Sequence, residues 1–166
     1  MNDAPLPTEI EAKFLVQALP ESLETCERQP ILQGYVLATD NCCLRLRRKG
    51  QKLIQSVKQG QGLTRYEVEI ELSEAQFNAL WPLTLHQRLT KTRYKVPLKG
   101  KLTAELDIYE GTLQGLATVE VEFESEADYE TFSRDQIPAW FGEEVTHDPR
   151  YLNQSLALKG LPEKSR

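Results

Sequence analysis

The sequence has few of the residues that build zinc or disulfide sites. It holds three cysteines, and Cys42 and Cys43 are adjacent, a spacing that fits neither a disulfide framework nor a usual zinc site. The only histidines, His86 and His147, are far apart and have no cysteine nearby in the sequence. The sequence therefore offers almost no residues that could form a zinc centre or a histidine-based catalytic triad. We expect reduced thiols, and a hard metal with oxygen ligands fits the residue inventory better.

Excess positive charge and long apolar runs are also missing. The formal net charge is −5, whereas proteins that bind duplex nucleic acid are usually basic, so no such partner is expected. No run approaches the ~18 apolar residues that a membrane helix needs. The N-terminus lacks a basic region followed by an apolar stretch, which a signal peptide would show. We therefore expect a cytoplasmic protein with no membrane partner.

The length and composition are those of one globular domain. The chain has 166 residues, of which 40% are hydrophobic and 27% charged, a balance typical of soluble domains. We expect one domain over residues 1–161 and a frayed tail over residues 162–166. Nothing in the sequence decides between a monomer and a homodimer.

Charged and apolar residues alternate along much of the chain. Glu9, Glu11 and Lys13 stand at every second position with apolar residues between them. In a β-strand this spacing puts the charged side chains on one face and the apolar ones on the other. The same pattern predicts further strands at 44–47, 67–72, 91–96, 105–108 and 119–124, and a less regular one at 52–58.

Capping patterns predict three helices. The first begins at Ser73, which forms a capping box with Gln76, and it stops at Pro82. The second begins in similar style at Ser125, directly after a strand. The third is expected to run over 148–160, because an Asp-Pro pair can cap and start a helix.

The charged strand faces allow two interpretations. An antiparallel sheet with one solvated face also alternates, so alternation alone shows only a half-buried sheet. These faces are nearly all ionic, however, and like charges about 7 Å apart on one strand repel unless an opposite charge intervenes. If the sheet closed into a barrel around them, the interior would be a wet channel. The acidic residues of the channel would bind metal ions, and the basic residues would bind phosphoryl oxygens. A polyphosphate that carries divalent metal ions needs both kinds of residue. The residues alone leave both alternatives open.

The motifs resemble one known family. Glu9, Glu11 and Lys13 in EIEAKF match the ExExK signature of the CYTH superfamily, the triphosphate tunnel metalloenzymes. The resemblance continues, in the order and spacing of small bacterial single-domain members, through QGYV, LRLR, SVKQG, RYEVE, KTRY, ELDIY, VEVEF and DPRYLNQSLA. It implies an α+β fold that is mainly antiparallel β, with a closed eight-stranded β-barrel that forms a tunnel with a charged lumen and flanking helices.

The resemblance also implies roles for individual residues. The metal ligands would be carboxylates, with Glu69 and Asp107 joining through water: Glu9, Glu11, Glu69, Asp107, Glu120 and Glu122. The cofactor would be Mg²⁺ or Mn²⁺, as two ions. The phosphates would be bound by basic residues: Lys13, Arg45, Arg47, Lys58, Lys91 and Arg93. Lys91 is also the candidate for selecting a short inorganic chain. Tyr35 is a candidate for activating water, with a packing role as the alternative.

The activity that follows is metal-dependent hydrolysis of inorganic tripolyphosphate to pyrophosphate and phosphate. One alternative is the processing of an organic triphosphate, by a thiamine triphosphatase, a nucleoside or RNA triphosphatase, or an adenylate cyclase. Another is a noncatalytic barrel that only binds polyphosphate. The many carboxylates argue against the second alternative, because passive anion binding does not need them.

Overall fold

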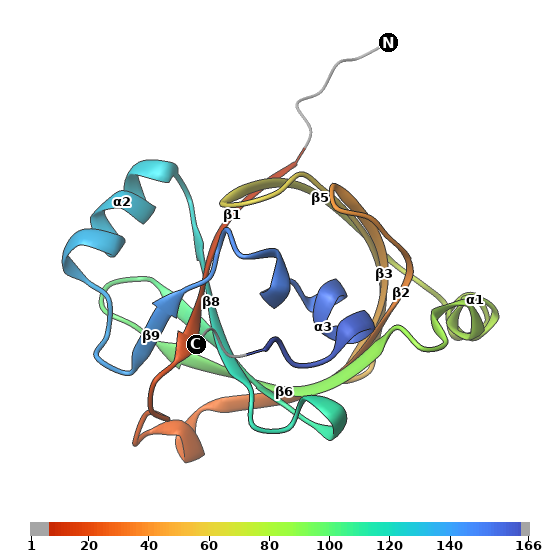
Figure 1. Cartoon of the computed structure of the whole chain (residues 1–166), viewed down its shortest axis with the longest axis horizontal. Coiled ribbons are helices and arrows are strands. Elements are labelled where there is room, and N and C mark those ends of the chain that lie inside the picture. Colours follow the sequence, from red (N-terminus) through yellow and green to blue (C-terminus); the bar gives the residue numbers. More distant parts are fainter. Residues whose placement is uncertain (1–6, 164–166) are drawn as a thin grey trace, which may run out of the picture.

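A single antiparallel sheet closed into a barrel forms the frame of the protein (Figure 1). The computed structural model describes residues 7–163. In that range the strands are β1 Thr8–Val16, β2 Glu27–Ala38, β3 Cys42–Lys49, β4 Lys52–Gln59, β5 Thr64–Glu71, β6 Arg88–Pro97, β7 Thr103–Tyr109, β8 Ala117–Phe123 and β9 Phe141–Glu144. Their order is β5-β4-β3-β2-β6-β7-β8-β1-β9, and a further pairing of β1 with β5 closes the sheet. The predicted eight-stranded barrel is confirmed, and β9 is added to it beside β1.

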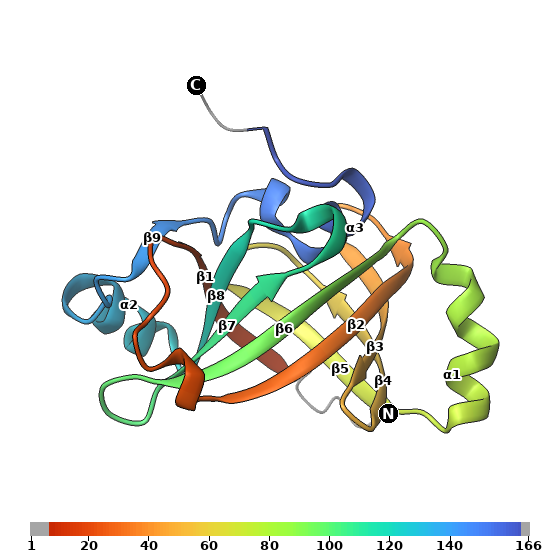
Figure 2. The ribbon, with the colours of Figure 1, turned by 90° about the horizontal axis from the view of Figure 1, so that it is seen from below.

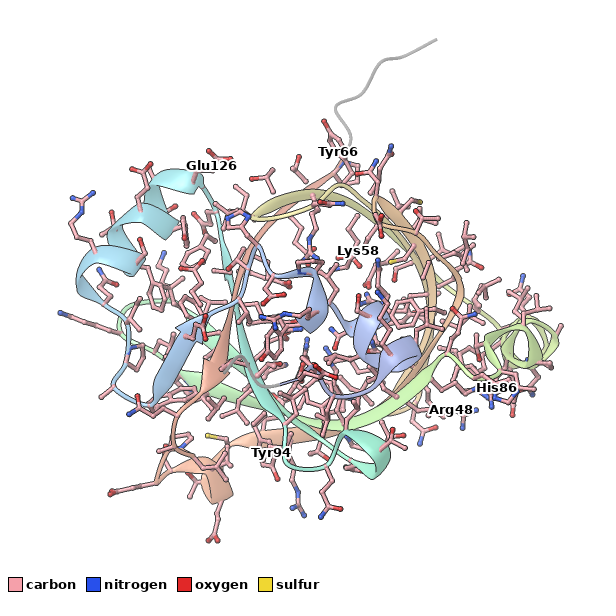
Figure 3. The ribbon with its side chains drawn as sticks, viewed as in Figure 1. Arg48, Lys58, Tyr66, His86, Tyr94 and Glu126 are labelled. Carbon is pink, nitrogen blue, oxygen red and sulfur yellow. The ribbon has the colours of Figure 1, made fainter. Side chains whose placement is uncertain are left out.

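The barrel has its charged faces inside and its apolar faces outside. Lys58 lies within the ring of strands, whereas Tyr66, Tyr94 and Glu126 lie outside it (Figure 3). The strand alternation explains this arrangement, because successive side chains point to opposite faces of the wall. The prediction of a charged lumen therefore holds, and the apolar core must lie elsewhere.

The main hydrophobic core lies outside the barrel, where helix α2 (Glu126–Asp135) and β9 cover the wall (Figures 1 and 2). Phe14 of β1 packs against Phe132 of α2 and Phe141 of β9, with ring centroids 6.2 and 5.1 Å away. All three rings are almost fully buried. Packing between the wall and α2 thus supplies the apolar burial that stabilises the barrel.

The first two predicted helices are present with their caps. Helix α1 (Glu74–Leu80) has the full capping box, in which the Ser73 hydroxyl accepts from the Gln76 N–H and the Gln76 side chain accepts from the Ser73 N–H. A 3₁₀ turn that contains Pro82 then ends it. At the start of α2, the Ser125 hydroxyl accepts from the Asp128 N–H. Among residues 7–163, no helix has the length and apolar character needed to cross a bilayer.

The prediction of one continuous helix over 148–160 is wrong. Asp148 and Pro149 start only a 3₁₀ turn, Pro149–Tyr151, and Leu152 is extended, with φ −62° and ψ 135°. Helix α3 (Asn153–Lys159) then begins in a new direction and lies across one end of the barrel (Figure 2). Its Leu156 packs with Leu89, Tyr109 and Leu113. This apolar contact at the barrel end fixes the position of α3 and accounts for the break at Leu152.

Candidate active site

A charged cavity of about 220 Å³ lies inside the barrel. Strands from the whole circumference contribute to its lining, and the segment around Tyr151–Gln154 covers one end. All of the sequence-predicted site residues line it except Lys91 and Asp107, which are almost completely buried. The structure therefore brings the predicted residues together at one site, and these two are joined to it through the contact of Asp107 with Arg93.

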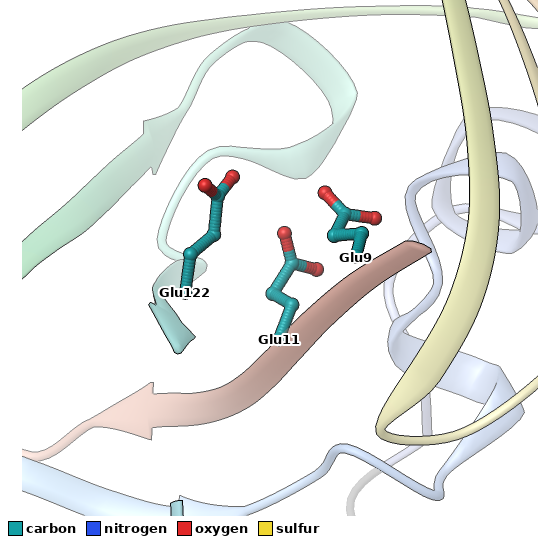
Figure 4. A group of neighbouring side chains, drawn as sticks. All are labelled: Glu9, Glu11 and Glu122. Carbon is teal, nitrogen blue, oxygen red and sulfur yellow. The ribbon is translucent and has the colours of Figure 1, made fainter. Parts of the chain in front are cut away.

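Three carboxylates converge at one place in this cavity (Figure 4). Glu9 and Glu11 on β1 and Glu122 on β8 have carboxylate oxygens within 4.8 Å of one another, and Glu11 stands directly opposite Glu122 in the strand pairing. Burial and the nearby charge of Glu120 raise the pKa of Glu11. Burial and the charge of Glu11 raise the pKa of Glu122 to about 7. These clustered carboxylates repel one another, and a bound cation would relieve that repulsion. Oxygen ligands of this kind suit a hard divalent metal.

Glu120 lies close to this group but is held by basic side chains. Its carboxylate pairs with the Lys13 ammonium at 3.2 Å and with an Arg93 NH2 group at 2.6 Å. Burial opposes ionisation of Glu120, yet the charges of Lys13 and Arg93 hold its pKa well below the usual value. In this structure Glu120 is therefore an ionised partner of the basic residues, separate from the three converging carboxylates.

Lys91 and Asp107 form a buried ion pair next to Arg93. The Lys91 ammonium lies 2.5 Å from one Asp107 oxygen, and Arg93 donates two hydrogen bonds of 2.7 Å to the same carboxylate. Burial lowers the pKa of Lys91 to about 8, although Asp107 acts against it. The Lys91 ammonium is also 3.4 Å from the Asn153 amide oxygen of α3. Both oxygens of Asp107 are thus engaged by cations.

The other predicted basic residues pair with acids that lie one or two strands away in the sheet. Arg45 and Arg47 of β3 contact Glu69 of β5 at 3.3 and 2.6 Å. Lys58 of β4 contacts Glu67 at 3.1 Å and Glu9 at 2.7 Å. In these contacts the acids supply the opposite charge that offsets the repulsion between like charges along each strand. Every predicted phosphate-binding side chain is therefore held in place by carboxylates.

Tyr35 lines the cavity, but its hydroxyl is deeply buried. Only 2% of its surface is exposed, and the hydroxyl accepts a hydrogen bond of 2.8 Å from the Gln33 side-chain amide. Tyr35 lies in the second half of β2. Burial raises its pKa above the ordinary value of tyrosine. The neutral phenol is therefore the favoured form.

Sequence reasoning missed several polar residues of the lining, among them Arg65 and Asn153. Arg65 opens the charged face of β5, two residues before Glu67, and its guanidinium contacts Glu11 at 2.6 Å and Glu9 at 3.4 Å. The period of two that identified the glutamates of β5 could have placed Arg65 with them. Asn153 accepts a hydrogen bond of 2.6 Å from the Tyr109 hydroxyl. The two residues are 44 positions apart in the sequence, so no local sequence pattern predicts this contact.

The family assignment follows from comparison with known proteins. The CYTH domain family matches residues 7–152. The chain belongs to the CYTH domain family. The inorganic triphosphatase of Nitrosomonas europaea is similar to this CYTH chain, with 45% identity over 152 residues that cover 91% of this chain and 97% of that protein. The inorganic triphosphatase of Acetivibrio thermocellus is 33% identical, covering 89% and 92%.

A solved structure supports the same assignment of the CYTH fold. The crystal structure of an inorganic triphosphatase is 41% identical in sequence and superposes with a TM-score of 0.68. The match covers 96% of this chain and all of that chain. The carboxylate group and the paired basic residues therefore belong to a barrel whose similarity to triphosphatases extends over nearly its whole length.

Proposed function

We propose that this protein hydrolyses inorganic tripolyphosphate to pyrophosphate and phosphate inside the barrel. The observation that carries the proposal is the position of Glu9, Glu11 and Glu122, whose oxygens converge in the same cavity that Lys58 and Arg93 line. A metal–polyphosphate complex is the ligand that uses both sets of charges. The inorganic triphosphatases of two bacteria, similar over nearly the whole chain, support the same activity.

The donor set fits a hard divalent cation. The three converging carboxylates offer only oxygen ligands, and the raised pKa values of Glu11 and Glu122 mark a place where positive charge is needed. We assign Mg²⁺ or Mn²⁺ to the site, as two ions, with Glu120 completing the set and Glu69 and Asp107 joining through water. Bound divalent ions neutralise phosphoryl oxygens and lower the pKa of a bound water.

The basic residues would bind and orient the phosphates. Lys13, Arg45, Arg47, Lys58 and Arg93 line the cavity, and each is now paired with a carboxylate. When metal ions take the carboxylates, these cations become available to the anion. Guanidinium groups can then donate to equatorial and leaving oxygens, where negative charge grows in the transition state.

Lys91 and Tyr35 are proposed to act close to the reacting phosphoryl group. Lys91 is proposed to favour a short inorganic chain, and its contact with Asp107 is the one that it would exchange for a terminal phosphoryl oxygen. The buried, neutral Tyr35 hydroxyl supports a hydrogen-bonding and packing role over that of a general base. Tyr35→Phe tests this choice, because a small effect on turnover is expected from a packing residue and a large one from a base.

We place the protein in the cytoplasm, where free thiols such as those of Cys26, Cys42 and Cys43 persist. Its proposed partners are the triphosphate and the metal ions, with no duplex nucleic acid and no membrane. A monomer and a homodimer are both compatible with the site, because its lining comes from one chain.

The test is release of phosphate from tripolyphosphate, ATP, thiamine triphosphate and pyrophosphate, each with Mg²⁺, with Mn²⁺ and without metal. We expect tripolyphosphate to be the best substrate and activity to require metal. Activity confined to ATP or thiamine triphosphate, or cyclic AMP as the product, would support an organic triphosphate instead. Tight binding of tripolyphosphate without any release would support a noncatalytic barrel.

A further inference from the structure

Arg65 occupies the carboxylates to which we assign the metal. It stands opposite Glu9 in the pairing of β1 with β5. Its guanidinium contacts a Glu11 oxygen at 2.6 Å and a Glu9 oxygen at 3.4 Å, and only 13% of the side chain is exposed. One cation therefore bridges two of the three converging carboxylates.

Arg65 differs from the other cation nearby. Lys58 contacts Glu9 but not Glu11, and it also holds Glu67. Among the ion pairs within residues 7–163, Arg65 is the only cation on Glu11, and none involves Glu122. The Arg65 Nε is buried and has no hydrogen-bond partner in the same part of the chain. The guanidinium is thus only partly satisfied where it lies.

A divalent ion and this guanidinium cannot use the same oxygens. Metal–oxygen distances of about 2.0–2.6 Å leave no room for an N–H donor on the same lone pairs. Arg65 cannot leave by losing its charge, because a guanidinium stays protonated in proteins. A metal that takes the Glu9 and Glu11 oxygens now in contact with Arg65 therefore requires this side chain to move.

We propose that Arg65 is an internal counter-ion that a metal ion displaces. The Arg65 guanidinium partly neutralises Glu9 and Glu11 in the metal-free protein. It also lowers the affinity for metal, because the two carboxylates are available to a metal ion only in the fraction of molecules in which Arg65 has moved away. Once displaced, its donors remain in the lumen for the anion that arrives with the metal. Arg65 is then a positioning residue that couples the two halves of the site, an inference that rests on the proposed metal site.

The test is titration of the metal-free protein with Mn²⁺, followed by electron paramagnetic resonance of the free ion, with no substrate present. Arg65→Gln should bind Mn²⁺ about tenfold more tightly than wild type, because the competing cation is gone. Lys49→Gln is the matched control. It removes one positive charge from the same cavity lining, but no ion pair joins Lys49 to Glu9 or Glu11. Its affinity should stay close to that of wild type.

Other outcomes are decisive in the same titration. An Arg65→Gln protein that binds Mn²⁺ no more tightly than Lys49→Gln overturns the proposal. If Arg65→Gln folds only with metal, Arg65→Lys replaces it. The lysine ammonium ends one bond short of the arginine nitrogen that contacts Glu9 and Glu11, so the competing contact is weaker, tighter binding is expected and unchanged binding is the contrary result. Glu11→Gln separates the two claims, because wild-type affinity in that variant would reject the metal site itself.

Discussion

Lys13 on β1 stands directly opposite Glu120 on β8, and their side chains form a buried ion pair at 3.2 Å. Two residues along the same strands, Glu11 stands opposite Glu122, so that position of the ladder carries two acids and no base. The pairing of β1 with β8 therefore places one residue pair with no net charge next to a pair of two acids. This difference supports the proposed metal site at Glu11 and Glu122 and the proposed role of Lys13 in binding the anion.

Replacing Glu9 with glutamine should remove turnover but not the fold. The loss of a metal ligand should lower kcat/KM for tripolyphosphate by about 100-fold or more. The unfolding free energy of the metal-free protein should change little, because relief of the repulsion from Glu11 and Glu122 offsets the loss of the Glu9 ion pairs. Glu130→Gln, on the exposed face of α2, is the control and should keep full activity. Unchanged phosphate release by Glu9→Gln would reject Glu9 as a ligand.

The three converging carboxylates predict how metal-free stability depends on pH. Burial and the charge of Glu11 raise the pKa of Glu122 from its ordinary 4.5 to about 7 in the folded protein. The folded state therefore binds more protons between these values, and the unfolding free energy should fall as pH rises from about 4.5 to 7. Urea denaturation in EDTA should show this slope, and it should be smaller in Glu122→Gln. That variant should also be the more stable protein at pH 8, and a less stable one would contradict the account.

Lys91→Ala should change which triphosphate is preferred. If Lys91 selects a short inorganic chain, the ratio of tripolyphosphate to ATP hydrolysis should fall, by about tenfold for the loss of one charged contact to a phosphoryl group. Removing Lys91 also leaves Asp107 with one cation fewer, so the variant should be less stable. The ratio is measured on a single preparation and does not depend on the fraction folded. An unchanged ratio would reject Lys91 as the selecting residue.

The position of the core outside the barrel predicts a stability effect away from the site. Phe132 of α2 is 1% exposed and packs against Phe14, Phe123 and Phe141. Phe132→Ala should lower the unfolding free energy by about 3–5 kcal/mol, with kcat of the folded fraction retained. Leu158→Ala, at a position 55% exposed, should cost under about 0.5 kcal/mol. Urea denaturation measures both, and equal losses would contradict this location of the core.

Much of the barrel could be predicted from the period of two in the sequence. The alternation around Glu9, Arg45 and Glu120 depends only on local strand geometry, so these segments are strands in the structure. Closure of the barrel came from the resemblance, because the pairing of β1 with β5 joins residues more than 50 positions apart. Strand β9 was not predicted, because its four residues, FGEE, show no strand pattern of their own and form a strand only by pairing with β1.

The site was predicted in its composition but not in its connections. The family resemblance supplied the proposed carboxylates and most of the proposed basic residues, and these line one cavity except for Lys91 and Asp107. Which acid pairs with which base depends on register between strands, and no residue spacing gives that register. The contact of Arg65 with Glu11 and that of Lys91 with Asp107 depend on this register. The break at Leu152 likewise depends on packing of α3 against the barrel end.

The most direct test of the central claim is ³¹P nuclear magnetic resonance of tripolyphosphate incubated with the wild-type protein. With Mg²⁺ or Mn²⁺, we predict loss of the tripolyphosphate signals and equal molar amounts of pyrophosphate and phosphate. With EDTA, the signals should persist. Tripolyphosphate that stays intact with both metals, or is cleaved equally fast in EDTA, would contradict a metal-dependent triphosphatase in this barrel.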